Sequence, residues 1–260
     1  MSEDKIGFIG VGNMGGPMAL NLVKAGRQLV VHDARADALK PFGNNVQIAS
    51  SPAEVASEAE IVLASLPRPE IVHGVVALDG PVSGGVAGAV KGTVAVMLAG
   101  PKREADIVAP KLAGMGQVFY IGPQPGMGQV MKLINNLLSA TAQAATAEAM
   151  VMGAKFGLDP TLMIEVLNAG TGRNSATDSK WPNEILPRRF KGGFAMGLMV
   201  KDLKLALETA EELHVPMWVH QAVKQLWLYA EGRGGPDQDI TELVKHLEAW
   251  NGITVAGRKS

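Results

Sequence analysis

A glycine-rich turn lies between an apolar run and a helical pattern near the start of the chain, within GFIGVGNMGGPMALNLVKAG (residues 7–26). The run KIGFIG before the turn reads as a short strand, and residues 14–25 carry apolar side chains at the spacing of a helix. Three glycines of the turn, at positions 10, 12 and 15, have separate uses in such a strand–turn–helix unit. Gly10 permits the tight turn, Gly12 lets a ligand touch the backbone, and Gly15 lets the helix pack closely on the strand.

This turn predicts a dinucleotide site, because the helix that follows it presents free N–H groups and the positive end of its dipole to a pyrophosphate. Asp33 ends the next strand-like run, RQLVVHD. An acid at that position can accept a hydrogen bond from a ribose hydroxyl and would repel a 2′-phosphate. We therefore predict NAD as the cofactor, and the nearby Arg35 keeps NADP open. The predicted contacts are Gly10, Gly12, Asn13, Met14, Gly15 and Asp33.

The first half of the chain alternates between strand-like and helix-like stretches. The runs VQIAS, EIVLASLP, GTVAVMLAG and QVFYIG are separated by helical patterns such as SPAEVASEA and READIVAPKLAGM. This alternation predicts βαβ units and a parallel, doubly wound α/β sheet of the Rossmann type. The second half reads as long helices, the first of them nearly uninterrupted over residues 127–157. We predict a dinucleotide-binding domain over residues 1–125 and an all-α domain for substrate binding and oligomerisation over residues 126–260.

The composition argues against several classes of protein. A net charge of −1 argues against a nucleic-acid partner held by its phosphate backbone. The absence of cysteine excludes disulfides and thiolate metal sites, and the five scattered histidines predict no zinc site. No apolar run reaches the roughly 18 residues that a membrane span needs, and MSEDK does not read as a signal peptide. We expect a cytoplasmic protein that binds a small molecule.

Four stretches of the chain resemble, in the same order, the signature segments of the β-hydroxyacid dehydrogenases, the family of 3-hydroxyisobutyrate dehydrogenase. VGNMGGPMALNL resembles the opening signature, and DGPVSGGVAGAVKGTVAVMLAG (79–100) resembles the substrate-binding segment. GMGQVMKLINN (126–136) resembles the catalytic segment, and GFAMGLMVKDLKLAL (193–207) resembles the C-terminal segment. The resemblance implies a Rossmann domain like that of 6-phosphogluconate dehydrogenase, followed by a helical domain. The implied activity is NAD(P)-dependent hydride transfer on a small β-hydroxy acid or its semialdehyde.

Lys132 and Asn136 are four residues apart and therefore share one face of the predicted helix. Lys132 lies among Met131, Leu133 and Ile134, where partial desolvation would lower its pKa and suit it to proton transfer. The resemblance makes Lys132 the catalytic residue, which exchanges a proton with the substrate oxygen, and makes Asn136 a hydrogen-bond partner of the substrate. Without the resemblance, a lysine whose ammonium reaches the solvent would be the more ordinary interpretation.

Ser83, Gly84 and Gly85 form a second glycine turn after a strand-like run. Their N–H groups and the hydroxyl suit a substrate carboxylate, and the resemblance implies the same role; a plain loop is the alternative. The polar stretch 170–182 reads as an exposed loop or the start of a helix. Arg173 within it is a weaker candidate for contact with a substrate carboxylate.

Further cofactor contacts are implied by the resemblance. Leu66 and Pro67 end a strand-like run at the carboxyl edge of the predicted sheet, where ligands bind in such folds. They are expected to contact the cofactor, and a plain strand end is the alternative. Lys201 begins a helix after GGFAMG, and the resemblance places it near the nicotinamide and the substrate. For Lys201 and its neighbour Asp202, an ion pair on the helix surface is the alternative.

The chain departs from the family pattern between Pro67 and Asp79, which are separated only by RPEIVHGVVAL. A crossover between parallel strands needs at least roughly 10–12 residues, and the family has a further strand and helix at this point. Either the protein lacks a strand–helix unit, or the sequence omits residues that belong between about residues 74 and 78. We favour an omission, which an intact mass well above 27.3 kDa would demonstrate.

Three roles remain open from the sequence. The leading one is a dehydrogenase or reductase, and its substrate stays open because relatives that reduce glyoxylate, other semialdehydes or imines share the same motifs. The second is a nucleotide-binding scaffold without turnover, which the short segment 68–78 would favour. The third, compatible with the first, is assembly into a homodimer or homotetramer. The Ala- and Met-rich helix over residues 127–157 suggests this assembly, because a monomer cannot easily cover both of its faces.

Overall fold

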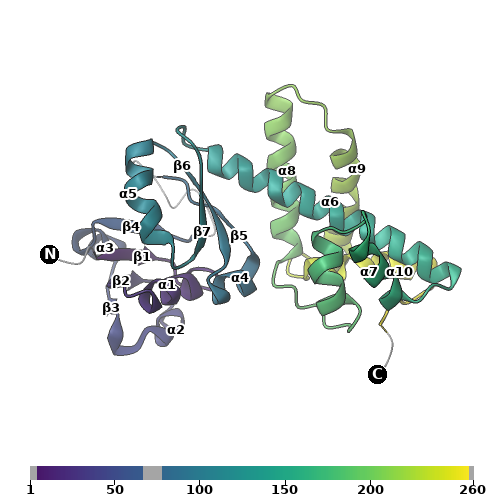
Figure 1. Cartoon of the computed structure of the whole chain (residues 1–260), viewed down its shortest axis with the longest axis horizontal. Coiled ribbons are helices and arrows are strands. Elements are labelled where there is room, and N and C mark those ends of the chain that lie inside the picture. The colour runs from purple at the N-terminus through teal and green to yellow at the C-terminus, as the bar shows by residue number, and fades with distance from the viewer. Residues whose placement is uncertain (1–4, 67–77, 258–260) are drawn as a thin grey trace. The chain divides into compact units, whose positions relative to one another are not determined.

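The computed structural model describes residues 5–66 and 78–257, and the chain divides into two compact units, residues 1–132 and 133–260. The first unit contains strands and short helices, and the second contains helices (Figure 1). The long helix α6 (Met127–Phe156) begins in the first unit and continues through the second. This architecture confirms the predicted fold class. Pro67 and most of the segment in which the family pattern breaks lie outside the described residues.

The first unit contains every strand-like and helix-like run that the sequence predicts for it. After the described chain resumes at residue 78, the first two elements, β5 and α4, are short. The elements are β1 (Ile6–Ile9), α1 (Gly15–Lys24), β2 (Leu29–His32), α2 (Ala36–Leu39), the 3₁₀ helix η1 (Lys40–Asn45), β3 (Gln47–Ile48), α3 (Pro52–Glu58), β4 (Ile61–Ala64), β5 (Val82–Ser83), α4 (Gly85–Lys91), β6 (Val94–Ala99), α5 (Lys102–Leu112) and β7 (Gly116–Gly122).

The described strands of this unit form two sheets. Four parallel strands make the first sheet in the order β3-β2-β1-β4. The second sheet has the order β5-β6-β7, in which β5 is antiparallel to β6 and β6 is parallel to β7. Among the described strands, β4 pairs only with β1. Among the described strands, the first sheet thus ends at β4, and most residues between β4 and β5 lie outside the described part of the chain.

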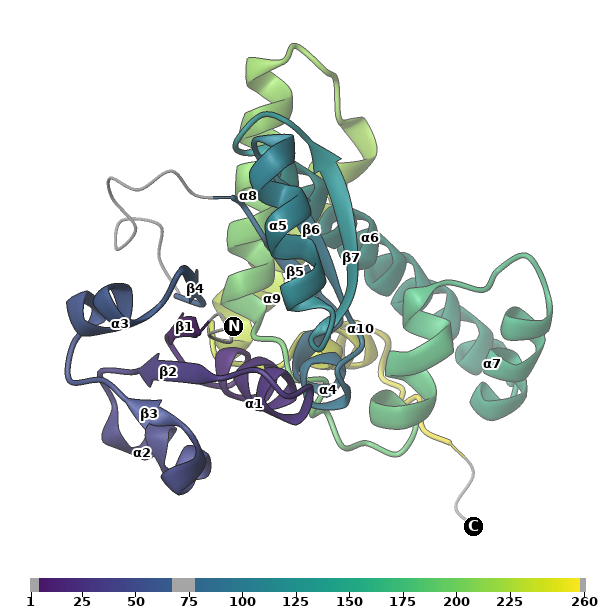
Figure 2. The same ribbon diagram turned by 60° about the vertical axis from the view of Figure 1, so that its left-hand side comes forward.

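One hydrophobic core joins the two sheets of the first unit. Phe8 from β1, Leu22 from α1 and Val96 from β6 are all buried in this cluster. Strands that are covered on both faces need continuous apolar runs, and the sequences IGFI and LVVH supply them. Full burial of a side chain such as Phe8 stabilises the fold by about 1.5–3 kcal/mol. Helix α5 covers the sheet of β6 and β7 (Figure 2).

The second unit is helical in its described residues, as the sequence predicts for this half of the chain. Its elements are α6, α7 (Pro160–Ala169), the π-helix η3 (Ala176–Ile185), α8 (Met196–Glu212), α9 (Trp218–Gly234), the 3₁₀ helix η4 (Ile240–Glu242) and α10 (Leu243–Asn251). Local signals set some of these boundaries: the Asp159 side chain accepts a hydrogen bond from the Leu162 N–H, and Pro160 begins α7. Among the described residues, no helix is both long and apolar enough to cross a membrane.

Two buried clusters hold the helices of the second unit together. The first cluster includes Leu137 of α6, Leu203 of α8 and Trp227 of α9. The indole N–H of Trp227 donates to the carbonyl oxygen of Ala140 at 3.3 Å, so the buried ring does not leave its polar group unpaired. The second cluster surrounds Trp181 of η3. Both clusters pack against α6, which fixes that helix as the centre of the second unit's core.

Candidate active site

The backbone of the first glycine turn has the close contacts that the predicted dinucleotide site requires. Gly10 adopts a φ of +85°, and a Cβ atom there would lie 2.4 Å from the carbonyl oxygen of Ser65. A Cβ atom at Gly15 would lie 1.9 Å from the carbonyl oxygen of Gly10. Glycine is therefore required at both positions. At Gly12 a Cβ atom would meet only the guanidinium end of Arg35, which can move away.

Helix α1 begins without a side-chain cap. Met14 occupies the N-cap position, and its side chain makes no capping hydrogen bond. Gly12 is half-buried and Asn13 is exposed just ahead of the helix. Orphan N–H groups at a helix start bind anions well, because they donate hydrogen bonds along the direction of the helix dipole. The start of α1 therefore has the chemistry of an anion-binding site, as the sequence predicts for this turn.

Asp33 lies at the end of β2, beside the glycine turn. Its two carboxylate oxygens accept hydrogen bonds from the backbone N–H groups of Val11 and Arg35, each at 2.9 Å. Desolvation raises the pKa of Asp33, but these two hydrogen bonds and the guanidinium of Arg35 outweigh it and lower the pKa. The carboxylate is thus ionised at neutral pH and keeps lone pairs for a ribose hydroxyl.

Leu66 lies beside the same turn. Its Cδ2 atom would be 3.1 Å from a Cβ atom at Gly10, at the carboxyl end of β4. Leu66 thus lies at the sheet edge where the sequence predicts cofactor contact. Pro67 lies outside the described residues.

The second glycine turn connects β5 with α4. Ser83 ends β5, Gly84 has a φ of +131°, and Gly85 has a φ of +62°. The left-handed backbone at both glycines explains why this turn contains two of them in succession. Ser83 and Gly85 are half-buried and Gly84 is exposed.

Asp79 holds the start of α6 against the second sheet. Its carboxylate Oδ2 accepts hydrogen bonds from the backbone N–H groups of Gly126 at 2.6 Å and Gly128 at 3.2 Å. A Cβ atom at Gly128 would lie 2.5 Å from the carbonyl oxygen of Met97, so the helix approaches β6 closely. The sequence did not predict this role of Asp79, because no local pattern pairs Asp79 with a helix start 47 residues further along the chain. Lys132 follows one turn later.

Asn136 is held by a polar network inside the second unit. Its Nδ2 donates to Asp202 Oδ2 at 2.6 Å, and its Oδ1 accepts from Asn135 Nδ2 at 3.1 Å. Because only the amide nitrogen can donate to a carboxylate, these contacts fix the orientation of the amide. Within the described part of the chain, these contacts leave Asn136 one N–H and one lone pair for a ligand. Asp202 also forms an ion pair with Lys201 at 3.0 Å.

The predicted site residues therefore fall into two groups, which the structure describes within separate units. The first unit combines the two glycine turns, Asp33, Leu66 and Lys132, and Lys132 is half-buried. The second unit combines Asn136 with the pair Lys201–Asp202. The side chain of Lys201 is 55% exposed, whereas Asp202 is buried. Asp202, which the sequence suggested only as an ion-pair partner of Lys201, also positions Asn136.

Arg173 and its surroundings differ in part from an exposed loop. Its guanidinium forms an ion pair with Asp178 at 2.7 Å, and both side chains are largely exposed. The polar stretch becomes the helix η3 from Ala176, which agrees with the predicted helix start. Trp181 at the end of the stretch is fully buried.

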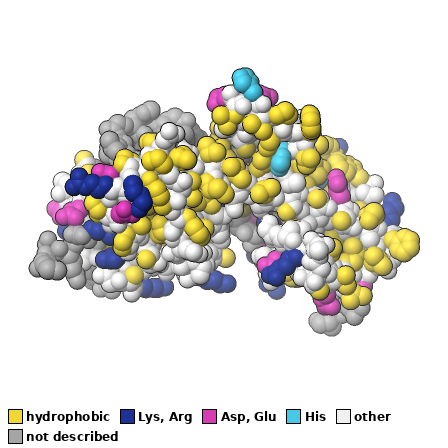
Figure 3. Space-filling model, turned by 45° about the horizontal axis from the view of Figure 1, so that its top comes forward, with side chains coloured by type: hydrophobic (Ala, Val, Ile, Leu, Met, Phe, Trp, Pro, Cys, Tyr) yellow, Lys and Arg dark blue, Asp and Glu magenta, His cyan; other side chains and the backbone are white. Residues whose placement is uncertain are grey.

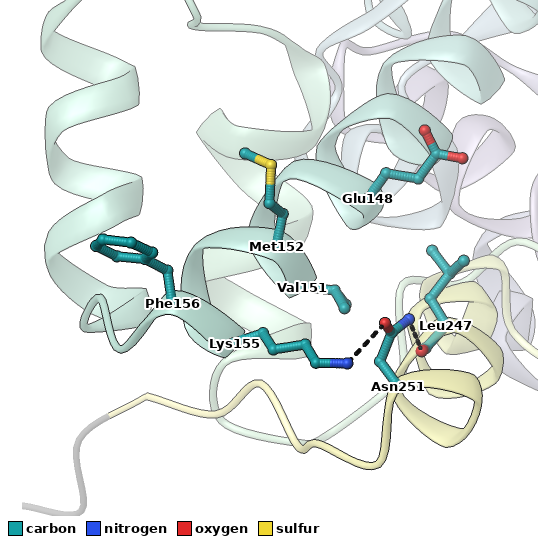
Figure 4. A pocket seen from close by; sticks show the side chains of 7 residues that line it. All are labelled: Glu148, Val151, Met152, Lys155, Phe156, Leu247 and Asn251. Carbon is teal, nitrogen blue, oxygen red and sulfur yellow. Dashed lines mark hydrogen bonds between the residues drawn. The ribbon is translucent and has the colours of Figure 1, made fainter.

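An apolar groove of about 490 Å³ lies at the far end of α6 (Figure 4). It contains none of the predicted site residues, and its first residue along α6, Glu148, is about 24 Å from Lys132 along the helix axis. Lys155 donates to Asn251 there at 3.5 Å. Its lining residues are Glu148, Val151, Met152, Lys155, Phe156, Leu247 and Asn251. This groove is a surface feature of the second unit rather than part of the candidate active site.

Family models match both halves of the chain. Residues 126–247 match the model described as the NAD-binding domain of NADP-dependent 3-hydroxyisobutyrate dehydrogenase. Residues 5–77 and 72–122 match the model of the NAD binding domain of 6-phosphogluconate dehydrogenase. The second match is broken at residues 72–77, within the segment where the sequence departs from the family pattern.

Individual relatives match nearly the whole chain. It is 31% identical to 2-(hydroxymethyl)glutarate dehydrogenase of Eubacterium barkeri, over 97% of this chain and 98% of the relative. It is 32% identical to mitochondrial 3-hydroxyisobutyrate dehydrogenase of Rattus norvegicus, over 95% of this chain and 88% of the relative. Each alignment spans 294 positions, more than the 260 residues of this chain, so both relatives contain residues without a counterpart here.

A solved structure gives the same result. The 3-hydroxyisobutyrate dehydrogenase of Mycobacterium tuberculosis with L-serine is 28% identical, covers 94% of this chain and 99% of its own, and has a TM-score of 0.82. The glycine turn with Asp33, the fold and the extent of these matches all indicate the same family. The chain therefore belongs to the β-hydroxyacid dehydrogenase family of NAD(P)-dependent oxidoreductases.

Proposed function

We propose that this protein oxidises a small β-hydroxy acid to its semialdehyde, or reduces the semialdehyde, with NAD as the preferred cofactor. The observation that carries the proposal is the glycine turn, whose Val11 N–H holds the carboxylate of Asp33 beside it, in a chain whose helix α6 carries Lys132 shortly after its start. Relatives named for 3-hydroxyisobutyrate and for 2-(hydroxymethyl)glutarate support this substrate class. Both compounds carry a hydroxymethyl group next to a carboxylate.

Each predicted site residue has a role in this proposal. The glycine turn, from Gly10 to Gly15, holds the pyrophosphate, and Asp33 accepts a hydrogen bond from the ribose. Leu66 lines the cofactor site, and Pro67 is proposed to do the same. A bound nicotinamide supplies the hydride acceptor or donor. Lys201, which the resemblance assigns to the cofactor, also keeps Asp202 in place against Asn136 by its ion pair.

The substrate is held by its carboxylate and its oxygen. The turn at Ser83, Gly84 and Gly85 binds the carboxylate through its N–H groups and hydroxyl. In oxidation the substrate carbon loses a hydride and its hydroxyl loses a proton, which the neutral amine of Lys132 accepts. In reduction the ammonium of Lys132 returns that proton to the oxygen. Asn136 contributes its remaining N–H to the substrate oxygen.

Lys132→Ala tests the assignment directly. Wild-type protein is mixed with NAD⁺ and either 3-hydroxyisobutyrate or 2-(hydroxymethyl)glutarate, and the absorbance of NADH is followed. We expect the variant to lose at least about a hundredfold in kcat, the range of general acid–base catalysis, while its affinity for NAD⁺ stays the same. Lys102→Ala, which removes an exposed lysine of α5, is the control.

A second candidate function is a nucleotide-binding scaffold without turnover. The eleven residues between Pro67 and Asp79, fewer than the family pattern has there, are the reason to consider it. Tight binding of NAD⁺ by the wild type with no NADH from any β-hydroxy acid would select this function over the first.

Homo-oligomerisation and a cytoplasmic location are also part of the proposal. Apolar side chains lie on the surface of the helical second unit (Figure 3), and Met152 and Phe156 of α6 are 72% and 87% exposed. Val166 of α7 is also exposed, at 62%. Large exposed apolar side chains at neighbouring positions are typical of a protein–protein contact, and a second copy of the chain would cover them. The cytoplasmic location is proposed from the sequence alone.

A further inference from the structure

A polar stripe runs along the face of α6 that carries Asn136. Ser139 and Gln143 follow Asn136 at helical spacing, so these side chains share that face with Lys132. Asn136 and Gln143 are both buried. The inward face of a bundle helix is normally apolar, so a buried run of polar side chains requires a reason.

Gln143 lacks the partners that a buried amide normally has. It is fully buried, and neither its Nε2 nor its Oε1 forms a hydrogen bond in the described part of the chain. Buried side-chain amides are nearly always hydrogen bonded. A polar group that does not belong to these residues is therefore expected beside the stripe.

The π-helix η3 brings a cation to the same stripe. Asn174, just before η3, donates to Thr146 at 3.2 Å, and Lys180 of η3 donates from its Nζ to the Ser139 hydroxyl at 3.3 Å. Thr146 and Ser139 are two turns apart on α6, so η3 runs beside the stripe in the direction of Asn136. π-Helices are frequent at functional sites.

The ammonium of Lys180 lacks a close anion. It is partly buried, and among the described residues no carboxylate forms an ion pair with it. Burial lowers the pKa of Lys180, and the charge of Asp239, acting through space, raises it. The hydrogen bond to the neutral hydroxyl of Ser139 replaces only a small part of the hydration that the ammonium loses on burial. By contrast, the nearby Lys201 is already paired with Asp202.

We propose that Lys180 binds a second anionic group of the substrate, so that the preferred substrate is a β-hydroxy acid with two anionic groups. This inference rests on the proposed function. Asn136 and Ser139 are about 4.5 Å apart along the axis of α6. In a substrate whose oxygen contacts Asn136, an acid group about three or four bonds from that oxygen would thus lie at Lys180.

The two compounds of the activity assay form a matched pair for the test. They share the hydroxymethyl group and the neighbouring carboxylate, and only 2-(hydroxymethyl)glutarate carries a second carboxylate. We expect the wild type to have the higher kcat/KM for the dicarboxylate. In Lys180→Met the ratio of kcat/KM for the dicarboxylate to that for the monocarboxylate should fall at least about tenfold, mainly through KM, since the lost contact is one of binding.

Lys180→Met retains the length of the side chain and removes its charge, so the variant should fold and have a melting temperature no lower than that of the wild type. Lys180→Arg should retain most of the wild-type ratio. Lys155→Met, at the far end of α6, is the control and should retain it fully. An equal loss for both compounds in Lys180→Met, or no loss for either, would overturn the inference while leaving the proposed function intact.

A binding measurement separates this inference from turnover. Glutarate and butyrate differ by one carboxylate and cannot react, and calorimetry gives their affinities for the wild type and for Lys180→Met. We expect glutarate to bind the wild type at least about tenfold more tightly than it binds the variant, and butyrate to bind both equally. If neither hydroxy acid is oxidised and glutarate still shows this difference, the proposed function fails and the anion site stands. Equal affinity of glutarate for the two proteins rejects the site.

Discussion

The carboxylate of Asp33 accepts hydrogen bonds from two backbone N–H groups, so its position is set before any ligand binds. Gly10 and Gly15 are fixed in the same way, because a Cβ atom at either would overlap a carbonyl oxygen. Asn136 is oriented by Asp202. At the scale of residues, the candidate site is thus preorganised by contacts within the chain, which reduces the cost of ordering it when ligands bind.

Asp33→Asn should change the choice of cofactor. An asparagine can still accept from the Val11 N–H, but it no longer repels a 2′-phosphate, and it releases Arg35 from its charge partner. We expect the ratio of kcat/KM for NAD to that for NADP to fall at least about tenfold. Steady-state kinetics with both cofactors measure it. Asp37→Asn, an exposed acid of α2, is the control, and an unchanged ratio in Asp33→Asn would show that Asp33 does not select the cofactor.

The same variant has a signature in the pH dependence of stability. The pKa of Asp33 is lowered by folding, so the unfolded chain binds its proton first as the pH falls. Its stabilising contribution is complete above about pH 4, the pKa of an unperturbed aspartate, and is lost as the pH falls through the lower folded value. The stability difference between the wild type and Asp33→Asn should therefore shrink in acid.

Among the elements, the start of α6 determines where the proposed catalytic lysine lies. Asp79 accepts hydrogen bonds from the N–H groups of Gly126, just before the helix, and Gly128 in its first turn, and Gly128 permits contact with β6. These contacts belong to the first unit, whereas Asn136, one turn beyond Lys132, is held by α8. A single helix thus carries the proposed proton-transfer group, Lys132, and the proposed substrate-binding amide, Asn136, at a fixed spacing.

Asp79→Ala should weaken both the fold and the activity. It leaves the N–H groups of Gly126 and Gly128 without their acceptor, and hydrogen bonds to a charged group contribute roughly 1.5–3 kcal/mol each. We expect the free energy of unfolding, measured with urea, to fall by about 2–3 kcal/mol, and kcat to fall because Lys132 loses its fixed position. Asp106→Ala on α5 removes an exposed acid and should change neither. Full stability of Asp79→Ala would contradict the proposed anchoring of α6.

At the scale of the whole molecule, large apolar side chains on the surface of the second unit remain exposed to solvent in a single chain. The exposed Met152 and Phe156 adjoin the groove between α6 and α10 (Figure 4). Folding normally buries side chains of this size, because each stabilises the protein by about 1.5–3 kcal/mol when it leaves water. Their exposure at successive turns of one helix is the basis for the predicted self-association.

Phe156→Lys should therefore shift the protein from an oligomer toward a monomer. A charge in the centre of an apolar contact must be desolvated without a partner, which opposes association. Light scattering combined with size-exclusion chromatography gives the molar mass of both proteins. Trp218→Lys, on the separate helix α9 and 84% exposed, is the matched control. A monomeric wild type would exclude self-association. A molar mass that falls in Trp218→Lys but not in Phe156→Lys would place the contact on another surface.

The sequence by itself determined the local features of this protein. Periodicity located the strands and helices, and the glycine turn with Asp33 predicted where the dinucleotide binds, because turn geometry and helix-end chemistry depend on residues close together in the chain. Resemblance then suggested Lys132 and Asn136. The short segment after β4 was also visible from the sequence, and the division of the described strands falls there.

Only the tertiary structure decided which distant residues meet. Asp79 reaches the start of α6, Asp202 orients Asn136, and Lys180 meets Ser139 across a sequence separation that no local pattern encodes. A buried acid or lysine looks the same in sequence as a solvated one. Its partners and its loss of water depend on packing, and packing is set by the whole fold rather than by neighbours along the chain.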